Sequence, residues 1–396
     1  MLDTHFSSWP DFTEEEAQAI QRVLLSNRVN YWTGKECRIF EEEFAAFIGV
    51  PHAVALTNGT VALDIALKAC KIGVGDEVIV TSRSFIASAS CIVTAGAIPI
   101  FADVDENSQN ITAETIKPLV TAKTRAIICV HLAGWPCDMD PIMDLAKAHG
   151  LCVIEDCAQA HGAAYKGRSV GSIGDIGAWS FCQDKIMTTG GEGGMVTTKD
   201  KVLYELMWSY KDHGKSKIAM EAARHAGPGF QWVHEQIGTN WRMIEIQAAI
   251  GRIQLTRMPS WHAKRLQHAT RIWSMARLLK GLRVPDLPAL IEHAAYKCYV
   301  FIKPEMLGDG WDRNRIMQSI RERGVPCYAG SCAEIYLEKA FENTVSRPHH
   351  RLPVAQALGE TSLMFLIHPT LSSEEIEKTC QVLKDVMLLA TEIISQ

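Results

Sequence analysis

The strongest constraint on the fold is a repeated alternation of short apolar runs with helical segments between residues 50 and 200. The apolar runs, most of them rich in Val and Ile, predict strands at 53–57, 77–81, 98–102, 126–131, 152–155, 178–181 and 195–198. Helical patterns lie between some of them, at 61–71, 84–95 and 141–149. This alternation is typical of an α/β protein with a mainly parallel central sheet that helices cover on both faces.

The remainder of the chain predicts a second, smaller domain. Residues 242–280 form long helical material, which we expect to be interrupted near Pro259 and to connect the two domains. A strand at 298–303 and helices at 313–323 and 374–389 follow, which favours a small α+β domain. We therefore assign residues 1–255 to a large domain and 256–396 to a small C-terminal domain. The stretch 214–229, with three glycines and a proline, predicts a mobile loop.

Whole-chain properties exclude several broad classes. The formal net charge of −5 over 396 residues argues against non-specific binding of nucleic acid. The longest apolar runs are too short to span a bilayer, and the first residues lack the basic and apolar regions of a secretory signal. The twelve cysteines show no zinc-ligand spacing. We therefore expect free thiols, no metal site, no membrane partner and a cytoplasmic location.

Two residues at the carboxyl ends of predicted strands suit one cofactor. Lys185 lies on a short turn before a glycine-rich segment, which leaves room for a bulky ligand, and Asp156 ends the run 151–155. A lysine in such a place can bind the aldehyde of pyridoxal phosphate as a Schiff base, and a carboxylate can pair with the protonated pyridine nitrogen. We therefore predict a pyridoxal phosphate enzyme in which Lys185 and Asp156 are the catalytic residues. Asp156 could instead cap the turn that follows it.

Other residues could hold the same cofactor, each with an alternative role. Gly59 and Thr60 open a helix whose free N–H groups could bind phosphate, although Asn58 or Thr60 could simply cap that helix. Gln159 could bind the phenolate oxygen or face solvent. Phe85 could stack on the ring or belong to the core. Ser180 could bind the phosphate. Three histidines, which we interpret as structural rather than as metal ligands or proton relays, are His161, His213 and His368.

The motifs together resemble the DegT/DnrJ/StrS family of nucleotide-sugar aminotransferases, pyridoxal phosphate enzymes of fold type I. The resemblance runs from about Trp32 to the C-terminus. It includes Phe40-Glu-Glu-Glu-Phe-Ala, Asn58-Gly-Thr-Val-Ala-Leu, Gly75-Asp-Glu-Val-Ile-Val, Gly96-Ala-Ile-Pro-Ile-Phe-Ala-Asp, Val130-His-Leu-Ala-Gly-Trp-Pro, Glu155-Asp-Cys-Ala-Gln-Ala-His-Gly-Ala and Asn240-Trp-Arg-Met-Ile-Glu-Ile-Gln-Ala-Ala-Ile-Gly.

The resemblance implies a role for each matching position. Lys185 matches the Schiff-base lysine, Asp156 the partner of the pyridine nitrogen, and Gln159 the residue beside the phenolate oxygen. The resemblance also implies ring stacking by Phe85, and phosphate contacts by Gly59, Thr60 and Ser180. Asn240 matches an asparagine that reaches the phosphate of the neighbouring subunit, which implies a homodimer with shared active sites. Tyr328 matches a small-domain tyrosine that could contact the sugar nucleotide, or could be a plain surface tyrosine.

The expected reaction is transfer of an amino group from L-glutamate to a nucleotide-linked keto-sugar. We expect a 4-keto-6-deoxyhexose, used for a surface polysaccharide such as lipopolysaccharide, with a 3-keto sugar still open. Cys157, Cys182, Cys327 and the segment 365–369 depart from the commonest family pattern, and the last two leave the sugar undetermined. Alternatives are a sugar dehydratase, which Lys185 disfavours because that branch carries His there, a cyclitol aminotransferase, and a non-catalytic regulatory protein of the same fold.

Overall fold

A seven-stranded sheet forms the centre of the large domain. The computed structural model describes residues 6–225 and 229–392. The strand order is β1-β9-β8-β5-β4-β2-β3, in which β9 is antiparallel to both neighbours and the other pairs are parallel. The strands are β1 His52–Leu56, β2 Glu77–Thr81, β3 Ile98–Ala102, β4 Thr124–Val130, β5 Cys152–Asp156, β8 Ile176–Ser180 and β9 Gly194–Thr198. All seven predicted strands are therefore present, and the mainly parallel sheet is confirmed.

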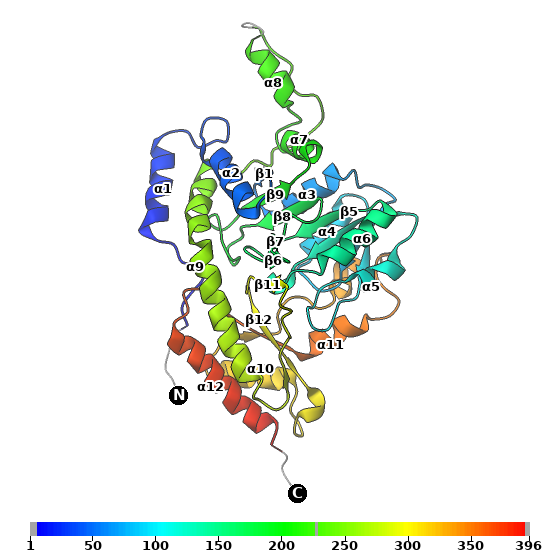
Figure 1. Cartoon of the computed structure of the whole chain (residues 1–396), viewed down its shortest axis with the longest axis vertical. Helices are drawn as coiled ribbons and strands as arrows, with labels where there is room; N and C mark the ends of the chain where they lie inside the picture. Colours follow the sequence, from blue (N-terminus) through cyan, green and yellow to red (C-terminus); the bar gives the residue numbers. More distant parts are fainter. Residues whose placement is uncertain (1–5, 226–228, 393–396) are drawn as a thin grey trace.

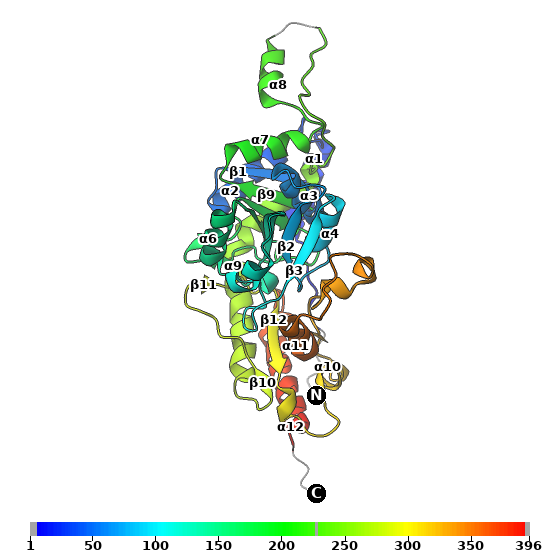
Figure 2. The same ribbon diagram turned by 90° about the vertical axis from the view of Figure 1, so that its right-hand side faces the viewer.

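Helices cover both faces of this sheet (Figure 2). Neighbouring residues of one strand point to opposite faces: Ile128 packs in a cluster with α3 and α4, whereas Ile127 packs in a cluster with α6. Both faces of a central strand are thus buried, which explains why the strands read as continuous apolar runs. The helices around the sheet are α2 Glu36–Ile48, α3 Gly59–Ala69, α4 Ala87–Thr94, α5 Ala113–Ile116, α6 Met139–His149 and α7 Lys201–Tyr210.

The long helix α9, Glu245–Ala276, joins the two halves of the molecule (Figure 1). Our expectation of an interruption near Pro259 is wrong, because α9 continues through this residue. Pro259 is exposed, while residues on the buried side of α9 pack on large-domain residues near its start and small-domain residues near its end. This packing outweighs the poor helix propensity of proline. The predicted boundary at 255/256 falls inside α9 and stays a prediction.

The small domain is built on a four-stranded antiparallel sheet. Its order is β10-β12-β14-β13, with β10 Leu282–Arg283, β12 Cys298–Ile302, β13 Cys327–Tyr328 and β14 Ser362–Phe365. Helices α10 Arg313–Glu322 and α12 Ser373–Ala390 pack on it in one apolar cluster with the end of α9. The predicted strand and both predicted helices are present. Further elements are α1 Glu14–Leu25, α11 Pro353–Thr361, and the three short strands β6 Ala164–Tyr165, β7 Arg168–Ser169 and β11 Ile291–Glu292.

Two local expectations need correction. The stretch 214–229 is not a plain loop, because it contains helix α8, Lys217–Arg224, whose N-cap Ser216 accepts a hydrogen bond from the Ala219 N–H. Residues 226–228 of that stretch lie outside the described residues. The cysteines are not all free, because a disulfide links Cys70 after α3 to Cys152 at the start of β5. Sequence spacing could not show this pair, since 82 positions separate the two residues. Within the described residues, no helix is long and apolar enough to cross a membrane.

Candidate active site

A cleft of about 440 Å³ lies between the large and small domains and contains Lys185. It brings together four of the predicted site residues, Lys185, Gln159, Phe85 and Tyr328. The small domain adds Tyr296, Lys297 and Tyr299 to its wall, which the sequence did not single out. A larger cleft, of about 730 Å³ between α1, α2 and α9, does not include Lys185. We place the active site in the smaller cleft because it holds the nucleophilic amine.

Lys185 sits on a tight turn that follows β8. Its N–H donates a hydrogen bond of 3.1 Å to the carbonyl oxygen of Cys182, and its side chain is 17% exposed. The ammonium Nζ lies 3.6 Å from Asp184 Oδ1 and 5.4 Å from the centroid of the Tyr296 ring. Trp9 donates from Nε1 to the carbonyl oxygen of Lys185 at 2.8 Å. The turn is therefore held from the large domain and from the N-terminal segment, while the amine reaches the cleft.

Asp156 lies at the carboxyl end of β5, as predicted, and its side chain is buried. Its Oδ2 accepts a hydrogen bond of 2.8 Å from Ser88 Oγ, and its Oδ1 accepts one of 3.1 Å from the Ala158 N–H. Burial raises the pKa of the Asp156 carboxyl, although these two donors and the charge of Lys185 act in the opposite direction. No ion pair within 4.0 Å involves Asp156 in the part of the chain that the structure describes. A cationic ring nitrogen would supply the missing counter-charge.

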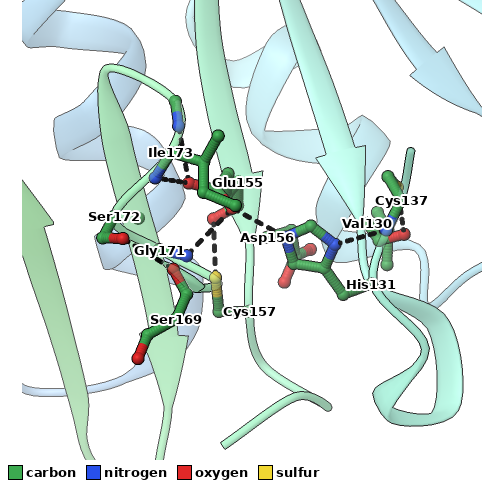
Figure 3. Close-up of polar contacts among 12 residues, drawn as sticks. Val130, His131, Cys137, Glu155, Asp156, Cys157, Ser169, Gly171, Ser172 and Ile173 are labelled. Atoms are coloured by element: carbon green, nitrogen blue, oxygen red, sulfur yellow. Dashed lines mark hydrogen bonds and ion pairs between the residues drawn. The ribbon is translucent and has the colours of Figure 1, made fainter. Parts of the chain in front are cut away.

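A buried network fixes the strand end that carries Asp156 (Figure 3). Glu155 accepts hydrogen bonds from the N–H groups of Gly171, Ile173 and Gly174, and its Oε2 lies 2.9 Å from His131 Nε2. His131 Nδ1 accepts from the Cys137 N–H, so the ring proton is on Nε2 and points at Glu155. These contacts keep the pKa of Glu155 below its usual range despite burial, chiefly through His131.

The same residues could be mistaken for a metal centre. Ligand atoms of His131, Glu155 and Cys157 lie within 4.8 Å of one another. However, both carboxylate oxygens of Glu155 already accept hydrogen bonds, and His131 uses both ring nitrogens. We therefore interpret the group as a structural network that supports Asp156. Sequence reasoning missed this role, although Glu155 and His131 both lie in quoted motifs, beside or after strand ends.

Gln159 has a fixed orientation. Its Oε1 accepts a hydrogen bond of 2.9 Å from the Ala133 N–H, which leaves the amide nitrogen free to donate into the cleft. A donor in this position suits a phenolate oxygen. Phe85 is 66% exposed at the start of α4, although it is a large apolar residue, and it lines the same cleft. Phe85 is therefore not a core residue of this chain, and its ring is available to stack on a cofactor.

The predicted phosphate contacts lie close together where α3 begins. A Cβ built on Gly59 would lie 2.5 Å from the Cβ of Ser180, so only glycine allows this approach. Asn58 caps α3 by accepting from the Val61 N–H at 3.0 Å, as in our alternative reading. That cap still leaves the N–H groups of Gly59 and Thr60 directed out of the helix end, where they favour an anion. Ser180 Oγ accepts from the Cys182 N–H and keeps its own proton to donate.

Of the remaining residues that the sequence singled out, Tyr328 lines the cleft, whereas Asn240 and His161 do not. Asn240 is exposed, pairs with Asp212 in an isolated bridge, and does not line the Lys185 cleft of its own chain. Tyr328 is 43% exposed and does line the cleft, on the small-domain side. His161 is fully buried between Trp179 and Phe181.

Comparison with known proteins decides the family. A family model, that of the DegT/DnrJ/EryC1/StrS aminotransferases, matches residues 10–384. The chain belongs to this family. The X-ray structure of the aminotransferase from Psychrobacter cryohalolentis is 58% identical to our aminotransferase, with a TM-score of 0.96 over 98% of this chain and 100% of that one. The match confirms the fold-type I assignment.

Two further relatives are named for the reactions that they catalyse. The aminotransferase is 34% identical to GDP-perosamine synthase of Escherichia coli O157:H7, over 95% of this chain and 96% of the relative. It is 33% identical to UDP-N-acetyl-3-dehydro-α-D-glucosamine 3-aminotransferase of Acidithiobacillus ferrooxidans, over 97% and 96%. The family is pyridoxal phosphate-dependent, and so is this aminotransferase. The residues fit the cofactor: the buried Asp156, the oriented Gln159 amide and the Gly59–Ser180 approach each offer what one part of it needs.

Proposed function

We propose that this nucleotide-sugar aminotransferase moves an amino group from L-glutamate to a 4-keto-6-deoxyhexose carried on a nucleoside diphosphate. The observation that carries the proposal is the placing of Lys185 in an interdomain cleft with Gln159 and Phe85, close to the buried Asp156. The similarity to GDP-perosamine synthase supports a sugar acceptor. The product would be an amino sugar for a surface polysaccharide, made in the cytoplasm.

The protein residues have separate tasks in this reaction. Pyridoxal phosphate, when bound, supplies an aldehyde and an electron sink for the substrate carbanion. Lys185 Nζ would hold that aldehyde, and as a free amine it would take the proton from the donor Cα. The Asp156 carboxylate would pair with the ring nitrogen and favour its protonated form. The Gln159 amide would donate a hydrogen bond to the phenolate oxygen of the cofactor, and Phe85 would cover one face of the cofactor ring. The same Lys185 amine moves the proton in the opposite direction for the sugar.

The reaction can be tested in two steps. Purified enzyme mixed with L-glutamate should release 2-oxoglutarate, and a nucleotide-linked 4-keto-6-deoxyhexose should then be aminated, which mass spectrometry detects. Lys185→Ala should abolish both steps, since loss of a general base alone costs roughly 10²–10⁴-fold. Asp156→Asn should retain cofactor but turn over poorly. Sugar conversion without 2-oxoglutarate would instead indicate a dehydratase, and acceptance only of a 3-keto sugar would move the reaction to that carbon.

The proposal includes a homodimer in which Asn240 completes the partner's site. It is supported by the position of Asn240 outside its own cleft. Nearby apolar side chains also support it, since Phe230, Trp232 and Ile237 are 77%, 84% and 91% exposed. Mixing Lys185→Ala with Asn240→Ala subunits tests it. In a two-fold dimer with shared sites, each mixed dimer has one intact site of two. Random exchange makes about half of the dimers mixed, so about a quarter of the wild-type activity should return. No recovery after verified subunit exchange would count against shared sites.

A further inference from the structure

Lys297 is a second amine in the Lys185 cleft. It follows Tyr296 directly in the chain and lines the cleft together with Lys185. Its Nζ lies 4.7 Å from the centroid of the Tyr296 ring, and the Nζ of Lys185 lies 5.4 Å from the same centroid. The two amines are therefore close neighbours around one aromatic ring, one from the large domain and one from the small domain.

The charges around these amines are not balanced. Asp184 is the acid beside them, and it is already engaged by Lys185 at 3.6 Å and by the hydroxyl of Tyr296. Behind the cleft, Arg265 is buried, and its Nε and Nη2 have no hydrogen-bond partner within the described part of the chain. Burial, with Arg265 and Lys185, lowers the pKa of Lys297 to about 8, although Asp184 opposes this shift. An anion that entered here would favour the ammonium form of Lys297 and reduce the excess of positive charge.

His368, whose pKa the charge of Lys297 affects, adds no further positive charge. His368 is largely buried, and burial, Arg265 and Lys297 lower its pKa to about 3, so it is neutral at ordinary pH. If Lys185 holds the cofactor aldehyde, Asp184 is left facing Lys297, while no acid acts on the Arg265 charge that also reaches Lys297 within the described residues, so one positive charge remains uncompensated. This net charge matches a single carboxylate.

We propose that Lys297 binds a carboxylate of the amino donor. The inference rests on the proposed function, because it assigns a contact to the donor of that reaction. The donor is the substrate that brings a negative charge next to the reacting carbon, since its α-carboxylate is bonded to Cα. The reacting end of a keto-sugar is neutral, and its phosphates lie beyond the sugar ring. The flexible stem of a lysine can also withdraw when the neutral sugar takes the place of the donor.

The test compares Lys297→Gln, Lys297→Met and Lys297→Arg in the cofactor-loaded enzyme. Calorimetric titration with 2-oxoglutarate measures carboxylate binding without turnover. Removing a charged hydrogen-bond donor should weaken this binding about 10–100-fold in the Gln and Met variants, whereas Arg should retain most of it. The apparent KM for L-glutamate should rise by a similar factor, while amination of the sugar by the pyridoxamine form should change less than about three-fold. Lys123→Gln, which removes an exposed lysine, is the control for lost charge.

The outcomes separate this inference from the proposed function. Unchanged 2-oxoglutarate binding in a folded Lys297→Gln enzyme would overturn it. So would a defect confined to the nucleotide sugar, which would assign Lys297 to the phosphates instead. If 2-oxoglutarate binding depends on Lys297 but no keto-sugar is aminated, the carboxylate site stands and the proposed acceptor is wrong. Circular dichroism and the melting temperature of each variant establish that the enzyme compared is folded.

Discussion

The indole N–H of Trp9 donates a hydrogen bond of 2.8 Å to the backbone carbonyl of Lys185. The Trp9 ring also meets Trp261 edge-on, lies nearly parallel to His368, and carries the Arg265 guanidinium 4.9 Å from its centroid. One residue near the N-terminus thus contacts the turn that presents the reactive amine, helix α9 and the small domain. We infer that Trp9 holds the Lys185 turn in position.

Trp9→Phe keeps an aromatic ring but removes the N–H donor together with one ring of the indole. A neutral hydrogen bond contributes about 0.5–1.5 kcal/mol, so we expect kcat to fall roughly 2–10-fold if the turn loosens. Steady-state kinetics at saturating donor and acceptor measure the effect. The matched control is Trp311→Phe, a partly buried tryptophan of the small domain away from the cleft. An equal fall in both variants would indicate a general loss of stability rather than a positioning role.

Ser88→Ala should shift the pH dependence of turnover. The Ser88 hydroxyl donates to Asp156 and lowers the pKa of that carboxyl, whereas burial raises it. Without Ser88, the pKa of Asp156 should rise further, so the carboxylate is lost earlier as the pH falls. The acidic limb of the kcat–pH profile should therefore move to higher pH. Ser90→Ala, on the same helix and partly exposed, should leave the limb in place. An unmoved limb in Ser88→Ala would show that Asp156 does not limit the reaction.

The sequence predicted the parts of the molecule that depend on local patterns. The seven strands follow from runs such as 77–81 that are apolar on both faces, and Lys185, Asp156 and Gln159 follow from motifs at strand ends. Partners distant in the chain were not predictable. Trp9 and Lys185 are 176 positions apart, Ser88 and Asp156 are 68 apart, and no periodicity links them. Pro259 shows where a local pattern misleads. Proline disfavours a helix interior, but packing of the two ends of α9 on the large and small domains keeps the helix continuous.

His161→Phe should make the protein more resistant to acid. His161 is fully buried against Trp179 and Phe181, and neither ring nitrogen has a hydrogen-bond partner among the residues that the structure describes. Burial, together with Lys185 and Arg265, lowers its pKa from 6.5 to about 3. The unfolded chain therefore binds a proton that the folded one does not, so stability is complete above about pH 6.5 and is lost as the pH falls towards 3.

The size of this effect can be checked by urea unfolding at two pH values. One such group changes the free energy of unfolding by about 1.4 kcal/mol per pH unit. Between about pH 7.5 and pH 5, the free energy of unfolding of the variant should therefore gain up to ~2 kcal/mol relative to that of the wild type. His149→Gln, an exposed histidine, should show no such difference. If His161→Phe and the wild type lose stability in parallel, the acid sensitivity comes from other groups, such as His293, whose pKa burial also lowers to about 3.

Pro259→Ala should stabilise the protein, because proline lacks the backbone N–H that an alanine would donate within the continuous helix α9. Pro259 is exposed inside α9, so its removal costs little packing. Proline is about 3 kcal/mol less favourable than alanine in a helix interior, and its smaller unfolded-state entropy offsets up to about 1 kcal/mol of this difference. We expect a gain of roughly 1–2 kcal/mol, measured as a higher denaturant midpoint with an unchanged slope. Ser260→Ala, at the next exposed position, should shift the midpoint by far less. A lower midpoint for Pro259→Ala would mean that the proline sets a bend by which the two halves of α9 fit their separate domains.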